Sequence, residues 1–189
     1  MRYKIQTKMN KIKKNKIYRN IYELEINFDQ KDKSKNIKEN FIFNGRSVSA
    51  ICFNRKIKVF YFIRQFRPNY FFNNTKTYPL EIVAGGIKKK ETSRQAVLRE
   101  IHEELGVQAL SVKKIDSLII APDCLEEITD IYLAEVPVIK KFKIINTEEG
   151  EYIDILPLKK NDILKLIDSK KTQNIVTKFA LLKIRELKL

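Results

Sequence analysis

The sequence predicts one α+β domain with layered α/β/α architecture, preceded by a basic N-terminal segment. Three observations support this. Alternating polar and apolar residues, typical of half-buried strands, recur through the first and middle parts of the chain. One segment with helical spacing interrupts them near the middle, and two more follow at the C-terminal end. This order excludes a doubly wound nucleotide-binding fold, in which strands and helices alternate throughout.

The N-terminal 43 residues are expected to form a basic arm and the first strands. Seven basic and no acidic residues precede Tyr18, which predicts a solvated arm. The alternation from Tyr18 to Phe28 predicts a strand. The polar, lysine-rich stretch from Gln30 to Asn40 predicts a loop, and apolar residues on both sides of Asn44-Gly45 predict two further strands.

The rest of the chain is divided clearly by its apolar periodicity. The expected strands are Lys58–Phe66, Leu80–Val83, Val112–Ile120, Ile131–Val136 and Tyr152–Leu158, with a loop at Pro68–Thr77. The expected helices are Thr92–Leu105, Asn161–Asp168 and Thr172–Leu187. Gly106 follows the first helix where a C-terminal glycine is favoured.

Composition narrows the function classes. With 189 residues, 43% of them hydrophobic, the chain can bury a core without disulfides or structural metals. Two cysteines and one histidine exclude a zinc finger and disfavour histidine-based nucleophilic catalysis. No apolar stretch approaches the length of a membrane span or a signal sequence, so we expect a cytoplasmic protein that does not contact membranes.

The chain carries 38 basic and 23 acidic residues, a formal net charge of +15. Lysine is far more frequent than arginine, which favours a generally lysine-rich surface over a dedicated nucleic-acid interface. We therefore do not expect nucleic acid to be the main partner. A positive surface would also attract small phosphorylated substrates.

The first predicted helix carries an unusual group of carboxylates. At about 100° per residue, its apolar side is formed by Val97, Ile101 and Leu105. The neighbouring sector contains Glu100, Glu103 and Glu104, with Glu104 closest to the buried side. Arg99 points about 100° away from Glu100, so a hard divalent cation is the simplest counter-charge. The alternative is a solvated glutamate-rich face.

The segment LEIVAGGIKKKETSRQAVLREIHEELGV, which starts at Leu80, resembles the Nudix box. Gly85 is followed after five residues by Glu91, and after seven more by Arg99-Glu100. The next residues are Ile-His-Glu-Glu-Leu-Gly-Val. The segment from Gly85 to Val107 thus fills every defined position of the Nudix box.

The resemblance implies a Nudix fold over residues 44–189, with a mixed β-sheet and a loop-helix-loop that holds Mg²⁺, or Mn²⁺ in its place, against a diphosphate. The implied metal ligands are Glu100, Glu104 and the main-chain carbonyl of Ala84, with Glu103 assisting catalysis. Structural roles fall on Gly85, Glu91, Arg99 and Gly106, including a salt bridge between Glu91 and Arg99.

The flanking residues resemble the ADP-ribose pyrophosphatase branch and its nucleotide-sugar relatives. They are Gln65-Phe66-Arg67, Glu81-Ile82-Val83-Ala84-Gly85, and Pro122 placed 15 residues after Val107. By this resemblance Arg67 binds substrate phosphates, with Arg46 a weaker candidate; the alternative for Arg67 is a structural ion pair. Glu127, in the loop after Pro122, is the implied general base, and Glu126 is its alternative.

The expected reaction is Mg²⁺-dependent hydrolysis of ADP-ribose to AMP and ribose 5-phosphate. The nearest alternative is another nucleoside diphosphate sugar, such as GDP-mannose. A different class of alternative is a basic RNA-associated protein or a hydrolase of RNA 5′ ends. The resemblance also implies a homodimer that uses the N-terminal strands within residues 1–43.

Overall fold

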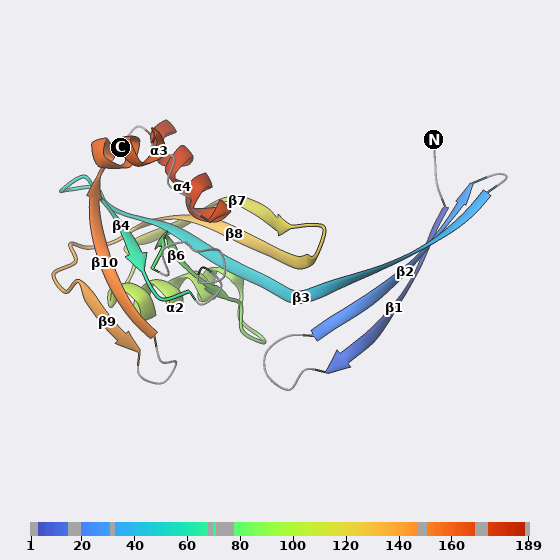
Figure 1. Ribbon diagram of the computed structural model, residues 1–189. Helices are drawn as coiled ribbons and strands as arrows, with labels where there is room; N and C mark the ends of the chain where they lie inside the picture. Colours follow the sequence, from blue (N-terminus) through green and yellow to red (C-terminus); the bar gives the residue numbers. More distant parts are fainter. Residues whose placement is uncertain are drawn as a thin grey trace. The chain divides into compact units, whose positions relative to one another are not determined.

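The computed structural model describes residues 4–14, 20–30, 33–67, 70, 78–146, 151–168 and 174–187. The chain divides into two compact units, residues 1–46 with 119–128, and residues 47–118 with 129–189. In Figure 1 the colours of the ribbon follow the order of the elements along the chain. The loop expected at Pro68–Thr77 lies outside the described residues, apart from Tyr70.

Long antiparallel strands dominate the first unit. Strand β1 (Lys4–Lys14) pairs with β2 (Asn20–Gln30), and β2 pairs with the first part of β3 (Lys33–Asn54). The strand predicted at Tyr18–Phe28 is therefore confirmed from Asn20 onward, and residues 18–19 lie outside the described residues.

One prediction for this region is wrong: the expected loop at Gln30–Asn40 lies largely within β3. The basic segment that was expected as a solvated arm contains β1. The ladder between β2 and β3 extends without interruption from Asn20↔Phe43 to Gln30↔Lys33. Main-chain hydrogen bonds form this ladder whatever the side chains are, so polar sequence did not prevent strand formation.

The two strands expected around Asn44-Gly45 are one continuous strand, β3. Gly45 has a φ of 78°, in the left-handed region that glycine adopts without steric cost. The glycine therefore accommodates an irregular position within a strand and does not end it.

Strands β7 (Ser111–Ala121) and β8 (Leu125–Glu135) pair with each other, and β8 also pairs with β3. The turn between them is only Pro122–Cys124, so β8 begins six residues earlier than the predicted strand at Ile131. The segment after Pro122 is thus mostly strand, where a loop was expected.

In the second unit the strand order continues from β3 through β4 (Val59–Arg64) and β10 (Glu151–Lys159) to β9 (Lys143–Asn146). The short strands β5 (Leu80–Glu81) and β6 (Val83–Gly86) pair with β4 and β3. Strand β9, which is only four residues long, was not predicted.

Three helices match the three predicted helical segments: α2 (Ser93–Leu105), α3 (Lys160–Asp168) and α4 (Ile175–Glu186). None of the helices in the described part of the chain is long and apolar enough to span a membrane.

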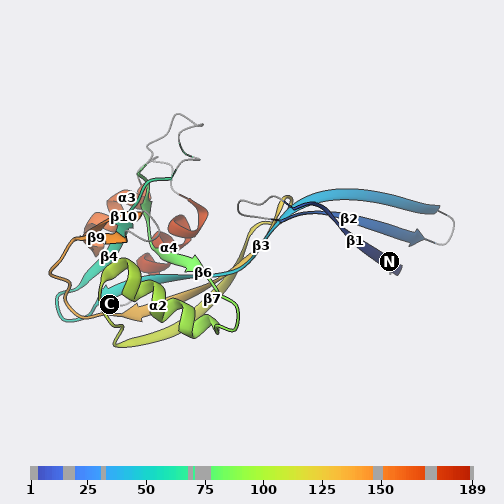
Figure 2. The ribbon, with the colours of Figure 1, turned by 90° about the horizontal axis from the view of Figure 1, so that it is seen from below.

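Residue alternation along β3 and β4 divides the core into two layers. Val48, Ala50 and Cys52 of β3 pack in one cluster with apolar residues of α2, whereas Ile51 and Phe53 pack in a second cluster with α3 and α4. Since successive strand residues point to opposite faces, α2 covers one face and α3 and α4 cover the other. Figures 1 and 2 show this arrangement, and the α/β/α layering is confirmed.

Candidate active site

Helix α2 is held at both ends by local interactions that its sequence encodes. Thr92 is the N-cap, and its side chain accepts a hydrogen bond from the backbone N–H of Gln95, while the Gln95 side chain accepts one from the Thr92 backbone. Gly106 ends the helix in the left-handed conformation, at a φ of 68°. These caps define where the helix begins and ends.

Two of the three helix carboxylates are buried against strand β6. Glu100 is 8% exposed and Glu104 is 4% exposed, whereas Glu103 is half-buried. The backbone N–H of Ala84 in β6 donates to Glu104 Oε2 at 3.1 Å. The carboxylates of α2 therefore converge on the main chain of β6.

Gly85 leaves the space that the Glu100 carboxylate fills. A Cβ atom at this position would collide with all three atoms of the carboxyl group, and even the farthest of them, Oε2, would lie only 2.5 Å away. Gly85 has no positive φ, so its requirement is this close approach and not an unusual backbone conformation.

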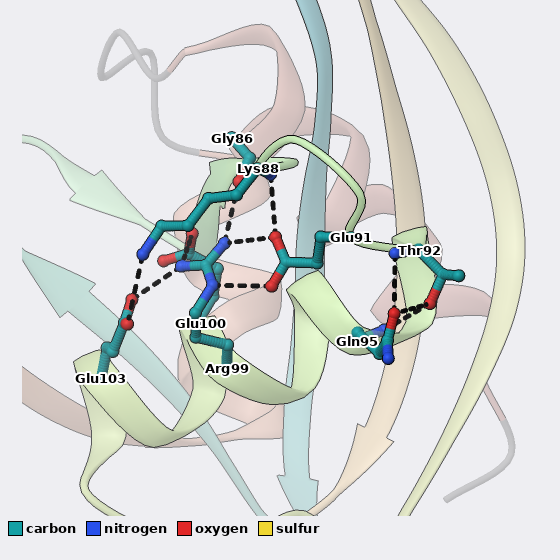
Figure 3. Close-up of polar contacts among 8 residues, drawn as sticks. All are labelled: Gly86, Lys88, Glu91, Thr92, Gln95, Arg99, Glu100 and Glu103. Carbon is teal, nitrogen blue, oxygen red and sulfur yellow. Dashed lines mark hydrogen bonds and ion pairs between the residues drawn. The ribbon is translucent and has the colours of Figure 1, made fainter.

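Arg99 joins the carboxylates to the loop that precedes the helix (Figure 3). Its Nε donates to Glu91 Oε1 at 2.8 Å and its Nη2 donates to Glu91 Oε2 at 3.0 Å. Nη2 also donates to the Gly86 carbonyl at 2.9 Å. This paired contact fixes the loop from Gly86 to Glu91 against the helix.

The expectation that Arg99 points away from Glu100 is wrong. Arg99 Nη1 donates to Glu100 Oε1 at 2.6 Å and to Glu103 Oε2 at 2.8 Å. The helical-wheel angle describes only the Cα–Cβ direction, and the long arginine side chain reaches around the helix surface. Lys88 adds a more distant charge, with Nζ 3.7 Å from Glu103 Oε1.

The two ends of this network have opposite pKa shifts. Hydrogen bonding from Arg99 lowers the pKa of Glu91 to about 2. Burial raises the pKa of Glu100 above its usual range, although Arg99 opposes the shift. Glu91 thus stays ionised, while Glu100 is a buried carboxylate whose negative charge is only partly compensated.

The donor set has the chemistry of a hard divalent-cation site. Glu100, Glu103, Glu104 and the Ala84 carbonyl offer only oxygen ligands, which Mg²⁺ prefers. Among the described residues no group of three or more acidic, histidine or cysteine side chains already has a metal-binding arrangement. Glu100 and Glu103 both accept hydrogen bonds from Arg99, so a bound cation and Arg99 would contact the same two carboxylates.

Arg67, the predicted phosphate ligand, is paired with a buried acid. Its Nε and Nη2 donate to Glu81 Oε2 at 3.0 and 2.8 Å. Glu81 is only 5% exposed and also accepts a hydrogen bond from Asn174, the N-cap of α4, at 3.0 Å. From the sequence, Glu81 was expected only as part of the motif that precedes Gly85, without this role, and nothing in the local sequence pointed to Asn174.

Asp130 is a second buried acid that the sequence analysis missed. Its Oδ2 accepts from Ser93 Oγ, in the first turn of α2, at 2.7 Å. Its Oδ1 accepts from Ser117 Oγ and contacts Lys114 Nζ, both at 2.8 Å. Asp130 therefore ties the start of α2 to strands β7 and β8, and its position within an alternating strand gave no signal of this.

Glu127 and Arg46 belong to the first unit. Glu127 lies on strand β8 and not on a loop, and its Oε2 accepts a hydrogen bond from the Asn44 side chain of β3. Glu126, the alternative base, is exposed on the same strand. Arg46 is exposed on β3.

Comparison with known proteins identifies the family. The NUDIX domain matches residues 43–172, and the chain belongs to this family. A crystal structure of an ADP compounds hydrolase has the same fold, with a TM-score of 0.75 and 15% sequence identity over 98% of this chain and 94% of that one. The expected Nudix fold is confirmed.

Individual relatives cover part of the chain. The ADP-ribose pyrophosphatase of Bacillus subtilis (strain 168) is 30% identical over 103 residues, which are 54% of this chain and 55% of that protein. The methanol dehydrogenase activator of Bacillus methanolicus is 30% identical over 101 residues, 53% and 54% of the two chains. A GDP-mannose pyrophosphatase of Escherichia coli is 24% identical over 123 residues, 65% and 64% of the two chains. The first two matches thus span about half of each relative.

Proposed function

We propose that this protein is a Nudix pyrophosphatase that hydrolyses the diphosphate of ADP-ribose to AMP and ribose 5-phosphate, with Mg²⁺ as cofactor. The observation that carries this proposal is the burial of Glu100 and Glu104 against the main chain of β6. Burying two carboxylates on one helix carries a desolvation penalty, which Arg99 offsets in part at Glu100 and which a bound cation would offset further. The similarity to an ADP-ribose pyrophosphatase supports the substrate.

Glu100, Glu104 and the Ala84 carbonyl would hold the ion, with Glu103 assisting. When bound, Mg²⁺, or Mn²⁺ in its place, supplies positive charge to a substrate diphosphate that these carboxylates would otherwise repel. The burial that raises the pKa of Glu100 is the local reason for cation affinity, because a nearby positive charge offsets the penalty of the ionised form.

The basic side chains orient the substrate and support the acids. Arg67 is positioned by its paired contact with Glu81, so its guanidinium has little freedom left to lose when it meets an anionic group. We assign it to the diphosphate, with Arg46 a further candidate. Arg99 holds the loop with Glu91 and orients Glu100 and Glu103 from the same guanidinium.

Hydrolysis requires a base that removes a proton from water as the water attacks phosphorus. We assign this role to Glu127, whose carboxylate is oriented by Asn44. Glu126, its exposed neighbour, is the alternative.

GDP-mannose is the second candidate substrate, and the similarity to GDP-mannose pyrophosphatases supports it. Both substrates place the same diphosphate against the same carboxylates and differ in the base and the sugar. They are therefore distinguished by relative rates and not by metal dependence.

We further propose that the protein is a cytoplasmic homodimer. In the described part of the chain, β1 pairs only with β2 and so presents an edge available to a second copy. Light scattering coupled to size-exclusion chromatography tests the dimer. A monomer at micromolar concentration would contradict it.

The direct test of function is AMP release from ADP-ribose, measured with Mg²⁺ and with chelator, beside GDP-mannose and ADP-glucose. Glu104→Gln should abolish Mg²⁺-dependent turnover while circular dichroism stays unchanged. Glu186→Gln, which alters an exposed acid at the end of α4, is the matched control and should keep wild-type activity. Normal turnover by Glu104→Gln would refute the metal assignment, and preference for GDP-mannose would replace the substrate.

A further inference from the structure

A cavity of about 510 Å³ lies where β3 and β10 end and where β4 and α3 begin. Its lining comes from the end of β3, the β3–β4 turn, the start of β4, the last residue of β10 and the first two residues of α3. Phe53 and Phe60 of its wall belong to the core cluster beneath α3 and α4, whereas α2 packs in the other cluster. The cavity is therefore separate from the carboxylate site on α2.

Cations from three elements line this cavity: Arg55 and Lys58 of the turn, Lys159 of β10 and Lys160 of α3. Strand register brings them together, because Val59 is paired with Asn54 on one side and with Lys159 on the other. No acidic residue is among the lining residues.

Within the part of the chain that the structure describes, two of the four cations contact other protein groups. Lys160 Nζ donates to the Leu187 carbonyl at the end of α4. Arg55 Nε lies 3.7 Å from Glu135 Oε2, a long pair in which the Arg55 side chain is exposed, so it contributes little neutralisation. Asp162, in the first turn of α3, is exposed and does not line the cavity. The net charge of the side chains that line the cavity is therefore positive.

The turn that carries Arg55 and Lys58 is held in a defined conformation. Buried Asn54 accepts a hydrogen bond from the Ile57 N–H at 3.1 Å, and its own amide donates to the Val136 carbonyl at 2.8 Å. Lys58 has a φ of 53°, which is unfavourable for any residue with a Cβ atom. Such positions concentrate at functional sites, where a side chain is retained despite the strain.

The geometry points to a binding site for a small phosphate ester with an apolar ring. Lys58 and Lys159 would contact the phosphate, and the start of α3 at Lys160 adds the partial positive charge of a helix N-terminus. Ile57, Val59 and Phe60 supply apolar wall for the ring. The cavity volume lies within the range typical of small-molecule sites, about 300–1,000 Å³.

The test measures the affinity of the protein for naphthyl phosphate by fluorescence titration, with naphthol as the uncharged control. The buffer contains a chelator, so that no divalent cation contributes to binding. We expect naphthyl phosphate to bind at least about tenfold more tightly than naphthol, since a charge-assisted phosphate contact is worth about a factor of ten. Lys58→Gly should weaken phosphate binding by a similar factor without lowering thermal stability, because glycine favours the positive φ. Lys159→Gln is the second variant and should act in the same direction.

Lys113→Gln, which removes an exposed lysine of β7 outside the cavity, is the matched control and should leave binding unchanged. Equal affinities for naphthyl phosphate and naphthol would overturn the proposal. So would wild-type affinity in both Lys58→Gly and Lys159→Gln. Loss of binding in Arg67→Ala with retention in Lys58→Gly would place the probe at the proposed diphosphate site and would overturn it as well.

Discussion

Replacing Gly85 by alanine tests the close approach between β6 and α2. The added methyl group would meet the Glu100 carboxyl group, whose farthest atom, Oε2, would be 2.5 Å away. An ordinary contact is about 3.5 Å, so the carboxylate must retreat by at least about 1 Å. Glu100 would also lose alignment with Arg99, whose Nη1 contacts its Oε1 at 2.6 Å.

A displacement of about 1 Å at a catalytic group can lower the rate by about 10²-fold. We therefore expect Gly85→Ala to reduce kcat/KM for ADP-ribose by at least this factor, or about 2.7 kcal/mol of transition-state stabilisation. Crowding of a packed site should also destabilise the fold by about 1–3 kcal/mol. Steady-state AMP release at saturating Mg²⁺ and thermal unfolding measure the two effects.

Gly86→Ala is the matched control, because a Cβ at the neighbouring glycine would have no heavy atom within 4 Å. This variant keeps the carbonyl that accepts from Arg99 and should retain activity within about twofold. If Gly85→Ala and Gly86→Ala behave alike, the close approach of Glu100 to Gly85 does not limit the reaction, and the argument fails.

Three further predictions concern acid stability, the base and the helix cap. Because Arg99 lowers the pKa of Glu91 to about 2, Glu91 should stabilise the fold above its unfolded pKa near 4.5 and lose this contribution as pH falls from about 4.5 to 2. The Tm difference between wild type and Glu91→Gln should therefore shrink over that range, and a constant difference would contradict the ion pair's contribution. Glu127→Gln should lower kcat by about 10²-fold or more, with Glu126→Gln near wild type, and the reverse result would exchange their roles. Thr92→Ala should destabilise the protein by about 1 kcal/mol and lower Tm by about 2–4 °C; an unchanged melting curve would mean that the cap is dispensable.

Local interactions were largely predictable from the sequence. Thr92–Leu105 was expected as a helix from its apolar spacing and from Gly106, and α2 occupies Ser93–Leu105. The burial of Glu104 also followed from helical geometry, because its angle to Val97 is set by the repeat of the helix. These features depend on residues within a few positions of each other.

Strand pairing in the N-terminal region was not predictable by the same means. The polar segment at Gln30–Asn40 forms strand because its backbone pairs with β2, and periodicity reports only a buried apolar face. Gly45 was interpreted as a turn because a glycine in the sequence indicates conformational freedom. The sequence does not show that a strand continues through this residue.

The family, the capped helix and the set of acids on it follow from the sequence alone, since motif spacing and helical periodicity are local properties. Which cation faces which acid depends on the tertiary structure. Arg99 contacts Glu91, Glu100 and Glu103 together, and Arg67 meets buried Glu81 beside Asn174, which lies 93 residues further along the chain. The interaction between two charged side chains depends on the distance between them in space. That distance is set by the packing of strands and helices that are far apart in the sequence.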